Sequence, residues 1–196
     1  MTISIPDRIR DTLQVIEATR AALTPAIEAV TAECVRSLQA GGTIFWAGNG
    51  GSAADAQHMA AELVGRFLVE RSPLRSIALT VDTSALTAIG NDYGFERTFA
   101  RQLQALGRRG DVLMAISTSG NSANILAAAQ TARAMGITVV GLNGRTGGKL
   151  KPQVDRLLAI PSESTPRIQE ALLIVEHLIC EGIEASMASA SASGSS

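Results

Sequence analysis

The chain has 196 residues, of which 46% are apolar, 18% charged and only 3% aromatic, and its formal net charge is −1. This length predicts one α/β domain with a substantial core. The charge balance argues against a protein that binds the phosphate backbone of nucleic acid, and the scarcity of aromatic side chains argues against one that stacks on bases.

The sequence predicts neither secretion nor a membrane anchor. The N-terminus carries charges and Pro6 where a signal peptide would need an apolar run, and no apolar segment approaches membrane-spanning length. Cys34 and Cys180 lie far apart and match no zinc-knuckle or redox spacing, which is typical of reduced thiols in a cytosolic protein. We therefore expect a cytoplasmic protein with no membrane partner and no nucleic-acid partner.

The first predicted unit is a helical hairpin over residues 7–39. Apolar residues recur at helical spacing as far as Leu23, and Pro25 is expected to start a second helix. Gly41 and Gly42 then end that helix. The apolar stripe of the hairpin can pack on the α/β core or on a neighbouring subunit, and the pattern leaves both open.

A strand, a glycine turn and a helix follow one another next. Residues 43–46 are short and apolar, which predicts a buried strand, and Ser52 after the glycines is a typical N-cap. The helix that follows carries His58 and Glu62 on one face, since they are four residues apart. A glycine turn at a helix N-terminus binds anions or hydroxyls, and this imidazole and carboxylate are a candidate metal or acid–base pair.

The same helix is expected to continue to residue 69. Arg66 lies four residues after Glu62, so the simplest interpretation of Arg66 is a surface salt bridge with Glu62.

Strands and helices alternate through the rest of the core. The further predicted strands cover residues 76–80, 111–116, 137–142 and 155–160, and the further helices cover residues 95–106, 123–135 and 164–185. A short helix capped by Asp82 or Thr83 precedes a loop over residues 89–94, where Asn91 and Asp92 are either turn residues or ligands for substrate hydroxyls. The alternation predicts an α/β fold, a doubly wound five-stranded parallel sheet flanked by helices, with ligands beyond the carboxyl ends of its strands.

A second turn between a strand and a helix, at residues 117–122, is rich in hydroxyls. Three serines and a threonine, a glycine and a helix N-terminus together favour a phosphate cradle over an ordinary capped turn. The turn has no lysine, so it does not match a nucleotide P-loop. The last helix carries Gln169 and His177 on roughly one face, and the serine- and alanine-rich tail, residues 186–196, is expected to be disordered.

Four motifs together carry a family resemblance. They are Ala47-Gly-Asn-Gly-Gly-Ser-Ala-Ala-Asp-Ala-Gln-His58 with Glu62 and Arg66-Phe67 after it, Leu86-Thr-Ala-Ile-Gly-Asn-Asp92, Ser117-Thr-Ser-Gly120, and Arg167-Ile-Gln-Glu170 followed by His177. With these motifs the chain resembles the sugar isomerase (SIS) domain superfamily and, within it, the phosphoheptose isomerases. The resemblance implies a single SIS domain over residues 1–185, with the hairpin (7–39), an α/β core (43–160) and the last helix (164–185).

The resemblance also implies an activity. Members of this family interconvert sedoheptulose 7-phosphate and D-glycero-D-manno-heptose 7-phosphate through an enediol, an early step towards the nucleotide-activated heptose of lipopolysaccharide or other surface glycans. It implies a homotetramer and one zinc ion per subunit. The implied zinc ligands are His58, Glu62, Gln169 and His177, with Glu62 as base and His177 as its acid–base partner. The implied substrate residues are Ser117, Thr118, Ser119 and Ser122 for the phosphate, and Asn49, Gly50, Gly51, Glu62, Arg66, Asn91, Asp92 and Gln169 for the remainder.

The chain departs from the family pattern at two positions near Gln169. Leu172 stands where many members have a histidine, and Pro166 stands where some have an aspartate. The first position is not one of those matched to the metal, whereas the second puts any substrate contact there in doubt and leaves Thr165 to fill it.

Three other functions remain to be weighed. A non-catalytic SIS protein that binds a replication-initiator partner is disfavoured because such relatives lack the residues equivalent to Glu62 and His177. An isomerase of another sugar phosphate is disfavoured by the paired motifs around those two residues. A dinucleotide-dependent oxidoreductase would rest on the loose pattern Gly48-x-Gly50-x-x-Ala53, which is weak alone.

Overall fold

The computed structural model describes residues 3–193, and side chains as far as residue 189. Its helices are α1 (Ile5–Gln39), α2 (Gly51–Val64), α3 (Thr83–Tyr93), α4 (Thr98–Leu106), α5 (Ala123–Met135) and α6 (Thr165–Ser193), with the 3₁₀ helices η1 (Phe95–Arg97) and η2 (Gly148–Gln153). Its strands are β1 (Ile44–Ala47), β2 (Ser76–Ala78), β3 (Val112–Ile116), β4 (Thr138–Gly144) and β5 (Arg156–Ile160).

The strands form one parallel sheet in the order β2-β1-β3-β4-β5, which confirms the predicted fold class. The chain runs from β1 to the edge strand β2 and then crosses to β3 on the other side of β1. The direction of winding therefore reverses between β1 and β3, and ligands of such sheets bind beyond the carboxyl ends of the strands at that point. Asn49 follows β1 and Ser117 follows β3, so the two predicted turns lie at this position.

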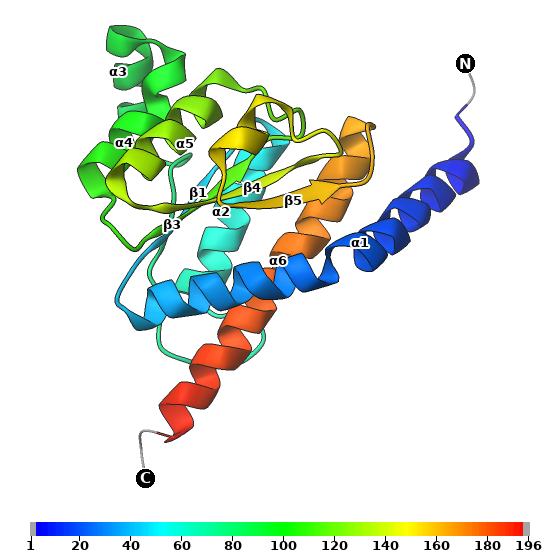
Figure 1. Ribbon diagram of the computed structural model, residues 1–196, viewed down its shortest axis with the longest axis horizontal. Helices are drawn as coiled ribbons and strands as arrows, with labels where there is room; N and C mark the ends of the chain where they lie inside the picture. Colours follow the sequence, from blue (N-terminus) through cyan, green and yellow to red (C-terminus); the bar gives the residue numbers. More distant parts are fainter. Residues whose placement is uncertain (1–2, 194–196) are drawn as a thin grey trace.

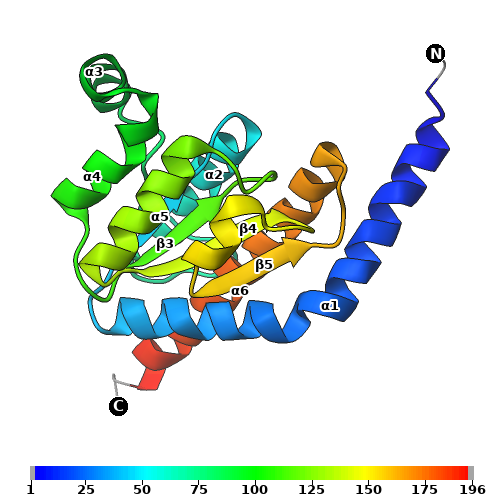
Figure 2. The ribbon, with the colours of Figure 1, turned by 45° about the horizontal axis from the view of Figure 1, so that its top comes forward.

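Helices cover both faces of the sheet, as Figures 1 and 2 show. Helices α1, α2 and α6 bury one face, and α4 and α5 bury the other. The strands supply both cores because successive side chains point to opposite faces: Ile44 and Trp46 pack with the first group of helices, and Phe45 and Ala47 with the second. In the α1/α2/α6 layer the N-terminal helix α1 packs against the C-terminal helix α6.

The predicted helical hairpin is wrong, because α1 is one continuous helix of 35 residues with Pro25 inside it. Figure 2 shows that α1 bends near its middle and does not turn back. Proline removes one backbone hydrogen bond and crowds the preceding turn, and a helix can absorb this as a bend when packing continues on both sides. Leu23 and Ile27 flank the proline and both pack in the same core, which keeps the helix going.

Other boundaries differ from the sequence prediction as well. The strands predicted over residues 76–80 and 137–142 cover residues 76–78 and 138–144, and the helix predicted over residues 95–106 begins with the 3₁₀ helix η1. Helix α2 ends at Val64 and not at residue 69, since Gly65 follows it as C-cap. Helix α3 includes most of the predicted loop over residues 89–94 and ends at Tyr93. Its N-cap is Asp82, as predicted, whose carboxylate accepts a hydrogen bond from the amide of Ala85 at 2.9 Å.

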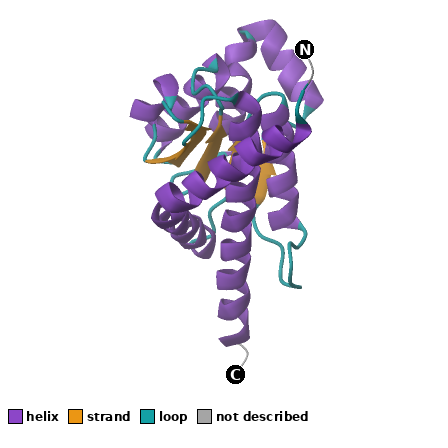
Figure 3. Cartoon of the chain, turned by 90° about the vertical axis from the view of Figure 1, so that its right-hand side faces the viewer, coloured by secondary structure: helices purple, strands orange, loops and turns teal. Residues whose placement is uncertain are grey.

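Helix α6 extends beyond the sheet, as the view in Figure 3 shows. The prediction of a disordered tail is therefore wrong for residues 186–193, which are helical, and the remaining residues 194–196 lie outside the described part of the chain. Alanine has the highest helix propensity, and no glycine or proline interrupts this stretch before residue 194. Long as α1 and α6 are, no helix within residues 3–193 has an apolar stretch that could cross a membrane.

Candidate active site

The glycine turn after β1 brings the start of α2 against α6. A side chain at Gly48 would collide with the backbone of Ser52, so the chain needs glycine there. The sequence predicts Ser52 as the N-cap of α2, and this is wrong, because the N-cap is Gly50. Ser52 lies one residue inside the helix, and its hydroxyl donates to Oε1 of Gln169 at 3.1 Å. The hydroxyl thus links α2 to α6.

About two turns further along α2, three ionisable side chains meet. His58 Nε2 lies 2.9 Å from Oε1 of Glu62, as expected for residues four apart on a helix. His177 comes from α6, and its ring meets that of His58 edge to face, with centroids 4.9 Å apart. One ligand atom from each of the three lies within 4.8 Å of the others. The structure therefore brings together three of the four predicted metal ligands.

The fourth predicted ligand, Gln169, lies two turns before His177 on α6 and is held by the first turns of α2. Its Nε2 donates to the carboxylate of Asp55, and its Oε1 accepts from Ser52. Because a carboxylate can only accept, this contact fixes which end of the amide faces Asp55.

Two acidic residues near this cluster were not predicted. Burial raises the pKa of Asp55, although the hydrogen bond from Gln169 and the charges of His58 and His177 oppose that rise. Glu176 is fully buried, and neither of its oxygens has a hydrogen-bond partner in the described structure. Burial, and then the charge of Asp55, raise the pKa of Glu176 well above its usual value. The spacing of Asp55 and His58, three residues apart on one helix face, could have revealed the first, whereas nothing local marks Glu176.

The hydroxyl-rich turn after β3 lies at the start of α5. Ser117 is buried, and its hydroxyl lies 3.1 Å from that of Ser122, the N-cap of α5. Gly120 has a φ of 65°, and a side chain there would collide with the backbone of Gly147. The turn is therefore packed tightly against the loop after β4. A helix N-terminus with several hydroxyls beside it is suited to a phosphate group.

An amide pair joins the two turns. Asn49 and Asn124 exchange two hydrogen bonds, of 2.9 and 2.8 Å, between their side-chain amides. Asn124 is buried in the first turn of α5, so it fixes Asn49 next to the hydroxyl-rich turn.

Three other predicted residues, Arg66, Asn91 and Asp92, are exposed. Asn91 and Asp92 are exposed near the end of α3, where their side chains bond to each other at 2.8 Å. The expected salt bridge between Arg66 and Glu62 is wrong: α2 ends two residues before Arg66, whose exposed side chain lies 3.9 Å from Glu70.

Comparisons with known proteins identify the family. The SIS domain family model matches residues 8–144. The phosphoheptose isomerase of Helicobacter hepaticus is 57% identical over 162 residues, 83% of each chain, and that of Rhodospirillum rubrum is 53% identical over 165 residues, 84% of this chain and 88% of the other. Solved phosphoheptose isomerases from Neisseria gonorrhoeae and Francisella tularensis have TM-scores of 0.87 and 0.90, identities of 42% and 38%, and matches that cover 92% of this chain and 97% and 96% of theirs. The chain belongs to the phosphoheptose isomerases of the SIS domain family.

Proposed function

We propose that this protein converts sedoheptulose 7-phosphate to D-glycero-D-manno-heptose 7-phosphate, an early step in the synthesis of nucleotide-activated heptose. One observation carries the proposal: a turn suited to phosphate follows β3 where the sheet reverses its winding, and a cluster of two imidazoles and a carboxylate lies between α2 and α6, the helices beside that point. The relatives named as phosphoheptose isomerases support the choice of substrate.

Aldose–ketose isomerisation moves a proton between two adjacent carbons through an enediol. Glu62 is the proposed base that takes the proton from carbon and returns it to the neighbouring carbon. His177 is the proposed acid–base group that moves a proton at the oxygens. The ligand atoms of these two side chains lie within 4.8 Å of each other, so one carbon–oxygen unit of the substrate can reach both.

The substrate phosphate is proposed to bind the hydroxyls of the turn after β3 and the N-terminus of α5. The proposed phosphate residues are Ser117, Thr118, Ser119 and Ser122. The proposed residues for the sugar chain are Asn49, Gly50, Gly51, Glu62, Arg66, Asn91, Asp92 and Gln169. The Asn49–Asn124 pair supports this division, because it holds the first turn at a fixed place relative to the second.

We also propose that each subunit binds one zinc ion. His58, Glu62 and His177 offer two imidazole nitrogens and a carboxylate oxygen, donor types that zinc accepts, and the amide oxygen of Gln169 is the proposed fourth ligand. A zinc ion at this position would polarise the substrate carbonyl as a Lewis acid. A carboxylate that binds a metal is a weaker base, so the two proposed roles of Glu62 compete.

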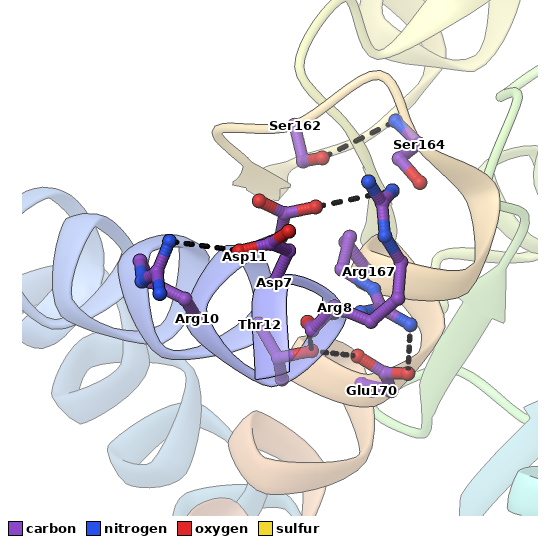
Figure 4. Close-up of polar contacts among 9 residues, drawn as sticks. All are labelled: Asp7, Arg8, Arg10, Asp11, Thr12, Ser162, Ser164, Arg167 and Glu170. Atoms are coloured by element: carbon purple, nitrogen blue, oxygen red, sulfur yellow. Dashed lines mark hydrogen bonds and ion pairs between the residues drawn. The ribbon is translucent and has the colours of Figure 1, made fainter. Parts of the chain in front are cut away.

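The assembly proposed is a homotetramer. The N-terminal half of α1 carries Ile5, Ile9 and Leu13, whose exposed fractions are 63%, 57% and 60%. Figure 4 shows how this half is tied to α6, with Thr12 donating to Glu170 at 2.9 Å. Exposed apolar residues grouped on one helix are typical of an interface.

Light scattering after size exclusion tests the assembly. We expect four chains per particle in the wild type and fewer in Leu13→Glu, while a monomeric wild type would contradict the proposal.

The activity is tested by turnover of sedoheptulose 7-phosphate by the purified protein, with other ketose phosphates as controls. A folded but inactive protein would favour the partner-binding alternative, and activity on another ketose phosphate alone would reassign the substrate.

A further inference from the structure

A buried ion pair lies beside the site, between the segment that follows α2 and the middle of α6. Nε of Arg71 lies 3.2 Å from Oε1 of Glu184, and these side chains are only 2% and 3% exposed. Removing two charges from water is costly unless other hydrogen bonds satisfy them as well. The contacts of each partner therefore indicate what the pair holds in place.

Arg71 holds the end of α2. Its Nη2 donates to the carbonyl of Glu62 at 2.7 Å, and its Nη1 donates to the carbonyls of Leu63 and Gly65 at 2.9 and 3.1 Å. The last carbonyls of a helix have no partner within the helix, so the guanidinium closes the helix end that carries Glu62.

Glu184 holds the segment that leaves α2. Its Oε1 accepts from the amide of Phe67 at 2.8 Å, and its Oε2 accepts from the amides of Leu68 and Val69 at 2.6 and 3.1 Å. The backbone of residues 67–69 is thereby fixed on α6. The side chains of Leu68 and Val69 remain exposed, by 59% and 46%, so the half-buried Phe67 is the side chain that this segment turns towards the site.

Phe67 lies on the ring of His177. The two ring centroids are 5.5 Å apart and the ring planes differ by 10°, which is a stacked arrangement. His177 precedes Glu184 on α6 by seven residues, or about two turns, so both lie on the same helix face. One helix therefore supplies both the imidazole and the carboxylate that fixes the aromatic ring against it.

We propose that the Arg71–Glu184 pair is a positioning device, which holds Phe67 on the face of His177 and thereby sets the orientation of that imidazole relative to Glu62. The effect on turnover rests on the proposed function, whereas the orientation of the ring does not. Phe67, Arg71 and Glu184 are positioning residues in this account, because they act through His177 and the end of α2.

The stacking of Phe67 on His177 can be measured directly because the chain contains only two histidines. The imidazole protons give two sets of NMR signals, which His58→Gln assigns. The ring of Phe67 shifts the signals of His177 in the wild type. All samples are compared at equal metal content. We expect Phe67→Leu and Glu184→Gln to move the His177 signals, and Phe67→Tyr, which keeps an aromatic ring, to leave them close to their wild-type positions. Leu68→Ala is the matched control, since it changes an exposed side chain of the same segment and should leave them unmoved.

Turnover gives the second readout. Small displacements of a positioned group cost up to about 100-fold in rate. We expect kcat to fall by about 10- to 100-fold in Phe67→Leu and Glu184→Gln with KM little changed, and to remain at the wild-type level in Phe67→Tyr and Leu68→Ala.

The proposal is overturned if the His177 signals of Glu184→Gln, which keeps the Phe67 ring, match the wild type, or if an active wild type and Phe67→Leu have equal kcat. Should Glu184→Gln fail to fold, Arg71→Lys decides the matter, because it changes the other partner of the ion pair and leaves the aromatic ring of Phe67 in the chain. A wild type that is inactive on sedoheptulose 7-phosphate would refute the proposed function, and the NMR comparison would still decide whether the Arg71–Glu184 pair holds Phe67 on His177.

Discussion

Replacing Glu62 by glutamine removes the proposed base and keeps the shape of the side chain. In the structure Glu62 pairs with His58 at 2.9 Å, and the two side chains are 20% and 46% exposed. A pair that is this accessible to solvent contributes at most about 1 kcal/mol. We therefore expect the free energy of unfolding of Glu62→Gln, measured without added zinc, to lie within about 1 kcal/mol of the wild type.

The effect on activity is expected to be much larger. Loss of a positioned acid or base costs about 10²- to 10⁴-fold in rate, which corresponds to about 2.7 to 5.4 kcal/mol in the activation barrier. Because the amide of glutamine can still bind the sugar, we expect kcat to carry most of this loss and KM to change little.

Steady-state isomerase assays and urea unfolding of the same preparations measure the two effects. Glu33→Gln is a suitable control, since Glu33 also belongs to a helical ion pair, with Arg36 at 2.6 Å, and has a side chain 25% exposed. The control should keep full activity. A kcat for Glu62→Gln close to that of the wild type would refute the assignment of the base.

Zinc should stabilise the wild type by about 2.7 kcal/mol when free zinc is a hundredfold above its Kd, and His58→Ala and His177→Ala should lose that stabilisation. Thermal unfolding with metal analysis measures the effect. A fully active metal-free enzyme would rule out a catalytic zinc. Ser117→Ala removes a hydrogen bond to a charged phosphate, about 1.5 to 3 kcal/mol, so kcat/KM should fall about tenfold or more, and an unchanged value would place the phosphate elsewhere. Burial alone would raise the pKa of Glu184, but three backbone amides and Arg71 outweigh it and lower the pKa below its usual value. A carboxylate whose pKa is lowered by folding stabilises the fold above its unfolded pKa, and this stabilisation is lost as the pH falls through its folded pKa. Urea unfolding should therefore show that the free energy of unfolding falls less between about pH 6 and about pH 3 in Glu184→Gln than in the wild type. Equal decreases in the two proteins would contradict this.

Much of the fold follows from local signals in the sequence. Helix α5 begins and ends where its pattern predicts: Ser122 occupies its N-cap position, and Gly136 ends it in the left-handed conformation. The prediction failed at Pro25, where packing on both sides outweighs the cost of proline, and in the tail after residue 185, where alanine propensity maintains a helix.

The site is harder to predict from the sequence than the fold, because its residues come from segments that are distant in the chain. The spacing of His58 and Glu62 predicts one face of α2, but their contact with α6 was implied by the family resemblance and not by any spacing. The contact of Phe67 with Glu184 joins residues 117 apart in the chain. Contacts of this kind depend on how α6 packs on α2, and no local sequence pattern predicts them.

The most direct test of the account is turnover of sedoheptulose 7-phosphate by the purified full-length chain, followed by NMR of the sugar signals. The account predicts that D-glycero-D-manno-heptose 7-phosphate forms with the wild type and that Glu62→Gln, which is expected to fold normally, forms at least about 100-fold less in the same time. No product from a folded wild type, or equal product from both proteins, would contradict it.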